Sequence, residues 1–179
     1  MTTYIALLRG INVSGQKLIK MAELAELFKS LNLVDVKTYI QSGNIVFKSD
    51  VGDKSELRQT IEKAIEQKYG FFVRVFMRTA EEWREVVADN PFLKEPEVDI
   101  SGLYVCFLDA IVSQENAAFF AAGGPDEERV HFSDYELYLH YPNGTGRSKW
   151  SNNFFEKKLG VDATSRNWRT VLKLASMCE

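Results

Sequence analysis

Two polar, glycine-bearing segments of the sequence combine the residue types that bind anions. Residues 9–15 have the sequence RGINVSG, and residues 41–44 have the sequence QSGN. Arg9, Lys17 and Lys20 place cations within or close to the first segment. Guanidinium and ammonium groups favour a phosphate or a carboxylate, as do backbone N–H groups at the start of a helix. The chemistry that these segments offer is therefore the binding of a small anion.

The elements around these two segments predict that they meet at one end of one sheet. Residues 4–8 and 45–47 are apolar runs typical of buried strands, and Ser42 with Gly43 makes a tight turn before the second run. In a split βαβ sheet the first and third strands are adjacent and antiparallel, so the exit of the first lies beside that turn. The candidate ligand-binding residues at this end are Arg9, Asn12, Lys17, Ser42 and Asn44.

The first 93 residues predict the order strand, helix, strand, strand, helix, strand, which is that of a ferredoxin-like, split βαβ unit. Apolar residues at helical spacing indicate the helices, and capping boxes at Asp53 with Glu56 and at Thr79 with Glu82 indicate where two of them start. The predicted elements are strands at 4–8, 36–40, 45–47 and 71–77, and helices at 21–31, 53–69 and 79–90.

Residues 94–179 repeat this order with one difference. A charged, proline-containing stretch at 94–101 separates the two predicted domains, 1–93 and 94–179. Thr164 or Ser165 is expected to cap a helix where the fourth strand would fall. The fold class is therefore α+β, with two fused ferredoxin-like halves of which the second is degenerate. The predicted elements are strands at 103–108, 129–132 and 136–141, and helices at 113–122, 151–159 and 164–175.

Two further polar clusters lie in the second half, each before the expected start of a helix. Residues 143–149 combine two glycines with Arg147 and Lys149, a composition that suits a phosphate or carboxylate. Arg166 and Asn167 can face either a ligand or the neighbouring half. Each cluster also has a structural alternative. At residues 9–15 and 41–44 the glycines permit tight turns and Arg9 pairs with a carboxylate. Residues 143–149 can be a flexible, solvated loop, and Thr164 or Ser165 can serve as a helix cap.

Three separated blocks of the sequence, in the same order, resemble one bacterial family. The blocks are LLRGINVSG, TYIQSGNIVF and LGVDATSRNWRTVLKL. The family that they resemble is called domain of unknown function 1697. The resemblance covers nearly the whole chain and implies no activity, so the sequence predicts a fold and a candidate site but no reaction.

Composition and missing motifs restrict the classes of function. A net charge of −3 disfavours a protein that coats nucleic acid. Residues 9–15 lack the spacing of a P-loop and of a dinucleotide-binding loop. The two cysteines and two histidines form no metal motif, so no cofactor is predicted. Neither a signal peptide nor a membrane span is expected, which predicts reduced thiols in the cytoplasm.

The two histidines are predicted to lie on the polar side of one hairpin. If Ser133 and Asp134 form a two-residue turn, cross-strand charge pairs account for both imidazoles without a metal. The predicted pairs are His131 with Glu136 and His140 with Glu127.

A second hypothesis uses a sheet face instead of the strand ends. Phe72, Arg74, Phe76 and Arg78 alternate along the expected fourth strand, and such a face can bind nucleic acid or a protein. Residues 43–47 lack the aromatic pair of an RNA-recognition motif, so we expect Phe72 and Phe76 to be largely buried against the second half instead. The leading hypothesis is that the protein binds a small anionic ligand, such as a phosphorylated metabolite or a nucleotide. Whether it also converts this ligand into a product stays open.

Overall fold

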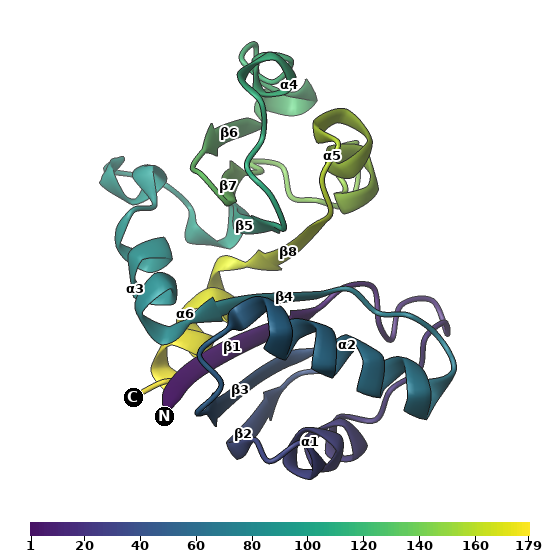
Figure 1. Ribbon diagram of the computed structural model, residues 1–179. Coiled ribbons are helices and arrows are strands. Elements are labelled where there is room, and N and C mark those ends of the chain that lie inside the picture. The colour runs from purple at the N-terminus through teal and green to yellow at the C-terminus, as the bar shows by residue number, and fades with distance from the viewer. The chain divides into compact units, whose positions relative to one another are not determined.

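The chain folds into two units with the same order of strands and helices. The computed structural model describes residues 1–179. Its internal packing separates unit 1, formed by Met1–Glu85 with Leu174–Glu179, from unit 2, formed by Val86–Lys173 (Figure 1). Packing units differ from domains that fold independently, so the predicted domains 1–93 and 94–179 remain a prediction.

Unit 1 is a four-stranded antiparallel sheet with two helices packed on one face. Its elements are β1 (Thr2–Leu8), α1 (Met21–Ser30), β2 (Val34–Tyr39), β3 (Asn44–Ser49), α2 (Lys54–Tyr69) and β4 (Val75–Thr79), followed by α3 (Ala80–Ala88). The strand order is β2-β3-β1-β4, and β1 pairs antiparallel with β3. The predicted central pair of strands is therefore confirmed. The core between sheet and helices includes Ala6, Phe28, Phe47 and Ile61, all fully buried.

Side chains cap α2 and α3 as the sequence predicts. Asp53 accepts hydrogen bonds from the backbone N–H groups of Ser55 and Glu56 at the start of α2. At the start of α3, Thr79 N–H donates to the Glu82 carboxylate over 2.8 Å, and Glu82 N–H donates to the Thr79 hydroxyl over 3.1 Å. Both predicted capping boxes thus mark real helix starts, because a cap depends only on neighbouring residues.

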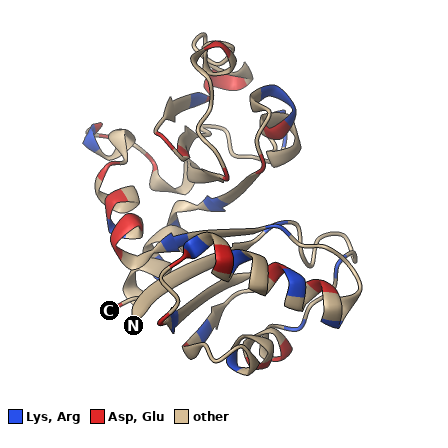
Figure 2. Cartoon of the chain, in the orientation of Figure 1, with Lys and Arg blue, Asp and Glu red and all other residues tan.

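Charged residues cover the outer surface of the longest helix. Acidic and basic residues alternate along α2 (Figure 2), whose buried residues form a single stripe that includes Leu57, Ile61 and Ile65. This pattern is typical of a helix with one face on a core and the other in water. No helix of the chain has the length and the apolar composition that crossing a membrane requires.

Unit 2 repeats the topology of unit 1 with all four strands. Its elements are η1 (Pro91–Lys94), η2 (Ile100–Gly102), β5 (Leu103–Leu108), α4 (Gln114–Ala118), η3 (Pro125–Glu127), β6 (Arg129–Phe132), β7 (Glu136–His140), α5 (Asn152–Leu159), β8 (Ala163–Asn167) and the first part of α6 (Trp168–Met177), whose residues from Leu174 on belong to unit 1. The order β6-β7-β5-β8 is equivalent to β2-β3-β1-β4. The predicted α+β class with two split βαβ units is confirmed. The second copy is reduced in α4, which has 5 residues where α1 has 10.

The expectation that a helix replaces the fourth strand of the second half was wrong. Residues 163–167 form β8, which pairs antiparallel with β5. The last helix begins later because Asn167 caps it: its side-chain oxygen accepts from the backbone N–H of Thr170 over 2.8 Å. Thr164 and Ser165 carry hydroxyl groups that suit a cap, but Thr also suits a strand, and the available partner strand decides between the two.

The turn between β6 and β7 lies one residue later than predicted. Ser133 N–H donates to the Glu136 carbonyl over 2.8 Å, so the two turn residues are Asp134 and Tyr135. A shift of one residue in the turn moves every cross-strand partner by two residues. The predicted histidine pairs were therefore wrong; the observed pairs are His131 with Tyr138 and His140 with Arg129.

Gly43, in the turn between β2 and β3, occupies a place where no larger residue fits. Its φ is +82°, and a Cβ atom there would lie 2.7 Å from Leu8 Cβ and 2.8 Å from Ile11 Cδ1. We predict that Gly43→Ala lowers the free energy of unfolding by ~1–2 kcal/mol for the left-handed backbone and by a further ~1–3 kcal/mol for the overlap.

Gly15→Ala is the matched control for this prediction. Gly15 has φ +75°, and no atom lies within 4 Å of a Cβ atom built there. At this position we expect only the decrease in unfolding free energy that comes from the left-handed backbone. Urea denaturation measures both variants, and equal losses of stability would contradict the packing role of Gly43.

Candidate functional site

The strand-end site of unit 1 is the place where β1 ends beside the turn between β2 and β3. Leu7 lies opposite Asn44 in the register of the two strands. One residue further on, Leu8 N–H donates to the Gly43 carbonyl over 2.8 Å. The juxtaposition of the two polar segments that the sequence predicted is therefore present in the fold.

The loop between β1 and α1 is a small hairpin with an unusual backbone. Val13 and Gln16 form a β-bridge around Ser14 and Gly15. Positive φ at both turn residues, +50° and +75°, is typical of a type I′ turn. Positive φ recurs in this loop at Gly10, Asn12 and Lys17. Left-handed backbone is strained at residues other than glycine, so surrounding contacts must hold the loop in place.

Asn12 provides those contacts. Its Nδ2 donates to the carbonyls of Ile19, over 3.0 Å, and of Gln41, over 2.8 Å, while its Oδ1 accepts from the Ile19 N–H over 2.8 Å. One amide thus closes the base of the loop and ties it to the neighbouring turn. All three bonds are to backbone groups, so Asn12 is a scaffold residue of the site.

Asn44 and Lys17 also bond within unit 1. The buried amide of Asn44 donates to the Tyr39 carbonyl over 2.9 Å and to the Ser42 hydroxyl over 3.0 Å. The exposed ammonium group of Lys17 donates to the Phe72 carbonyl over 2.8 Å. These bonds fix the geometry of the strand-end site, and the role of these residues in binding a ligand stays a prediction.

The N-terminus of α1 differs from those of the other α-helices. Lys20 is the N-cap residue, and no side chain accepts a hydrogen bond from the first turn. Lys20 Nζ lies 3.6 Å from Glu23 Oε1, and both side chains are largely exposed, so this pair is weak. The other α-helices begin with a side-chain acceptor, at Asp53, Thr79, Ser113, Ser151 and Asn167. A cation beside the positive end of a helix dipole favours an anion there.

The polar loop at residues 143–149 precedes a helix that already has a cap. Ser151 accepts a hydrogen bond from the Phe154 N–H over 3.2 Å at the start of α5. Arg147 and Lys149, in the loop before it, are exposed. The capped helix attracts an anion less strongly than the start of α1, since one of its N–H groups is satisfied.

Arg166 and Asn167 have structural roles in unit 2. Arg166 is buried, and its Nη1 donates to the Thr164 hydroxyl over 2.9 Å and to the Ser165 carbonyl over 2.8 Å. Burial lowers the pKa of its guanidinium to about 10, which leaves it charged at neutral pH. Asn167 caps α6. A ligand-binding role for either residue stays a prediction.

The sheet face of the second hypothesis offers one accessible ring. β4 begins at Val75, later than predicted, so Phe72 precedes the strand. Phe72 is 44% exposed with the Arg74 guanidinium 5.3 Å from its ring centroid, whereas Phe76 is 3% exposed. The expected burial is correct for Phe76 and wrong for Phe72. A single accessible ring is a poor platform for stacking successive bases.

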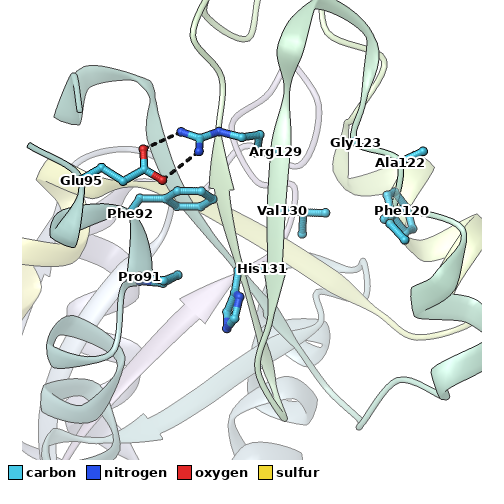
Figure 3. A pocket seen from close by; sticks show the side chains of 10 residues that line it. Pro91, Phe92, Glu95, Phe120, Ala122, Gly123, Arg129, Val130 and His131 are labelled. Atoms are coloured by element: carbon cyan, nitrogen blue, oxygen red, sulfur yellow. Dashed lines mark hydrogen bonds and ion pairs between the residues drawn. The ribbon is translucent and has the colours of Figure 1, made fainter. Parts of the chain in front are cut away.

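An open cleft of about 460 Å³ lies beside β6 in unit 2, and the sequence did not indicate it. Figure 3 shows the Arg129 guanidinium above the Phe92 ring and joined to Glu95. The two N–O distances of this bidentate pair are 2.8 Å, and the guanidinium carbon lies 4.9 Å from the ring centroid. Phe120 stands on the opposite side of β6. No sequence spacing connects Glu95 with Arg129, so only the fold reveals the cleft.

His140, on β7, accepts a hydrogen bond from Arg129. The distance from Arg129 Nη2 to His140 Nδ1 is 3.0 Å, and a guanidinium can only donate. Nδ1 is therefore unprotonated, and the neutral imidazole carries its proton on Nε2. Burial and then the charge of Arg129 lower the pKa of His140, while Glu95 and Asp99 act in the opposite direction.

Together, the topology and the strand-end site define an α+β protein of two split βαβ units with a candidate anion site. The chain belongs to the family described as "Protein of unknown function (DUF1697)", whose profile matches residues 1–138. The resemblance seen in the sequence is thereby confirmed. The chain is also similar to the conserved bacterial protein SP0830 from Streptococcus pneumoniae, with 25% identity and a TM-score of 0.79 over 99% of this chain and 98% of that one. No curated protein matched the sequence.

We predict that Asn12→Ala destabilises the protein in the absence of any ligand. The substitution leaves backbone groups of the loop without partners, which costs ~1–3 kcal/mol. Asn32→Ala is the matched control, because Asn32 has a similar backbone, with φ +60° against +54°, and its side chain makes no hydrogen bond. Urea denaturation measures both variants, and an equal loss in the control would show that only the backbone conformation matters.

We predict that the pKa of His140 lies below the ordinary value of 6.5. Well above pH 6.5, His140 has no effect on stability. As the pH falls from 6.5 to the pKa of folded His140, the unfolded chain binds the proton more readily than the folded protein, so the free energy of unfolding decreases. Below that pKa, His140 causes no further decrease. An NMR titration of the imidazole signals, assigned with His131→Gln, measures the pKa. A pKa above 6.5 would mean that the carboxylates of Glu95 and Asp99 affect His140 more strongly than burial and Arg129 do.

Proposed function

We propose that the strand-end site of unit 1 binds a small anionic ligand, such as a phosphorylated metabolite or a nucleotide. The observation that carries this proposal is the start of α1 at Lys20, without a side-chain cap and directly after a loop that also holds Lys17. A phosphate or carboxylate at this place accepts hydrogen bonds from the N–H groups of the first turn and offsets the charge of Lys20.

The fixed shape of the loop supports the proposal. Three hydrogen bonds from the Asn12 side chain close the loop without a ligand, so binding does not have to order it. A preformed site loses less conformational entropy on binding. Arg9 leaves β1 at the same strand end, and its planar guanidinium suits a phosphate or a carboxylate better than an ammonium group does.

A ligand screen tests whether any anion binds. The probes are inorganic phosphate, pyrophosphate, and panels of sugar phosphates and nucleotides. A ligand present at ~100 times its Kd stabilises the folded protein by ~2.7 kcal/mol, which a thermal-shift experiment detects. The N–H signals of Met21, Ala22 and Glu23 in the NMR spectrum are expected to shift on binding. Shifts confined to unit 2 would contradict the proposed place.

We predict that Lys20→Asp stabilises the free protein and abolishes anion binding. An aspartate at the N-cap accepts from the first turn of α1 itself, which is worth ~0.5–2 kcal/mol. Its carboxylate then occupies the position of the ligand's anionic group. Stabilisation with unchanged binding would place the anion elsewhere.

Lys29→Asp is the charge-matched control for this variant. Lys29 lies in the last turn of the same helix, where it pairs with Glu26 over 2.7 Å. The net charge changes by the same amount, but an acidic residue near the C-terminus of a helix is unfavourable. This variant is expected to be less stable than the wild type and to bind the anion nearly as well. A similar loss of binding in Lys20→Asp and Lys29→Asp would show that the change in net charge, and not the position of Lys20, weakens binding.

We further predict that Arg9→Ala weakens binding of the best anion from the screen. Losing one charge-assisted hydrogen bond costs ~1.5–3 kcal/mol, so the Kd is expected to rise by roughly 10- to 100-fold. Arg9→Lys keeps the charge but loses the planar fork, so its Kd is expected to lie between those of the wild type and Arg9→Ala. Isothermal titration calorimetry measures all three proteins; an unchanged Kd in Arg9→Ala would remove Arg9 from the site.

A further inference from the structure

β6 is an edge strand of unit 2, and half of its backbone groups have no strand partner. It pairs with β7 alone. The Ser133 N–H bonds to the Glu136 carbonyl, and hydrogen-bonded pairs alternate with non-bonded pairs along an antiparallel ladder. Arg129 and His131 therefore turn their backbone groups toward β7. Val130 and Phe132 turn theirs outward, to the open edge of the sheet.

The cleft of about 460 Å³ follows this edge and has a wall on each face of the sheet. One wall carries Phe92, Glu95, Arg129 and His131, and the other carries Phe120 and Val130 (Figure 3). Successive side chains of a strand point to opposite faces. A second strand laid along β6 would therefore place its side chains alternately against one wall and the other.

The equivalent edge strand of unit 1 is protected against such pairing. The register of β2 shifts between Val34 and Lys37, where Asp35 has φ +52° and its carboxylate pairs with Lys48 over 2.6 Å. Bulges and charged side chains on an edge strand hinder the addition of another strand. β6 pairs in regular register at each of its four residues. Its edge therefore lacks the bulge that protects β2.

We propose that β6 binds an extended peptide segment by strand addition, with apolar and basic side chains in alternation. The apolar side chains pack on the wall of Phe120 and Val130, and the backbone of the peptide bonds to the outward groups of Val130 and Phe132. In this mode main-chain bonds give affinity, and pockets for alternate side chains give specificity.

The charges around the cleft favour a basic peptide. Arg129 is the one lysine or arginine of the cleft lining, and Glu95 already neutralises it through two hydrogen bonds. Asp126 and Glu127 are exposed and lie three and two residues before the start of β6. Asp126 and Glu127 therefore place two exposed carboxylates near the start of this edge, where they attract a basic side chain.

The test uses a synthetic hexapeptide of alternating lysine and valine with both ends blocked. At saturating peptide, hydrogen exchange at the Val130 and Phe132 N–H groups of the whole chain is expected to slow by ~10-fold or more, with little change at His131. Unchanged exchange at Val130 and Phe132 in the presence of bound peptide would overturn the proposal. Protection of the same groups that rises with protein concentration, without peptide, would also overturn it in favour of a second copy.

Two N-methylated versions of the peptide separate strand addition from simple charge attraction. Methylating the valine nitrogens blocks the donors of one edge, and methylating the lysine nitrogens blocks those of the other. Only the version that loses the donors facing β6 is expected to bind ~10-fold more weakly or worse, since it alone loses hydrogen bonds to the protein. Equal affinities of the two versions would overturn the proposal without any change to the protein. A glutamate–valine peptide is expected to bind much more weakly, and equal binding by it would overturn the choice of a basic segment.

Discussion

The first strand of each unit, β1 or β5, is paired on both sides, and this pairing determines where the loops lie. β1 runs antiparallel to both β3 and β4, so the chain leaving β1 meets the turn before β3 and the segment before β4. Two backbone hydrogen bonds join these segments: Leu8 N–H donates to the Gly43 carbonyl over 2.8 Å, and Arg9 N–H donates to the Arg74 carbonyl over 3.0 Å. The convergence of three loops follows from strand pairing alone. Their side chains are then available to close the loops or to bind a ligand.

The polar residues of the strand-end site divide between these two tasks. Asn12 and Asn44 bond mainly to backbone carbonyls, because an amide that suits a ligand equally suits the irregular backbone of a tight loop. A lysine has no acceptor with which to satisfy the first turn of a helix, so Lys20 leaves that need at the start of α1 unmet. Under the proposed function, an anion would therefore contact the cations and backbone N–H groups of the site more than its asparagines.

Features that depend on neighbouring residues could be predicted from the sequence, whereas features that depend on distant partners could not. The caps at Asp53 and Thr79 involve residues within one helical turn, and the pairing of β1 with β3 follows from the order of elements. β8 was missed because only its pairing with β5 distinguishes it from a capped helix. The cleft was missed because the Glu95–Arg129 pair spans 34 positions. The turn of the β6–β7 hairpin was misplaced because Ser133 and Asp134 both suit turns, whereas the residue that completes the observed turn is Tyr135, a type more common in strands.

The repeated topology also shows which properties of the strand-end site do not follow from the fold. In unit 2 the loop after β5 occupies the position that the loop after β1 has in unit 1. There Asp109 accepts a hydrogen bond from the Asp162 N–H over 2.8 Å, and Ser113 caps α4 by accepting from Asn116. An acidic residue and a self-capped helix make that end of unit 2 less favourable for an anion than the start of α1. Strand pairing is shared by the two units, so the difference between their strand ends resides in a few loop residues, and the cationic, uncapped end is a property of unit 1 alone.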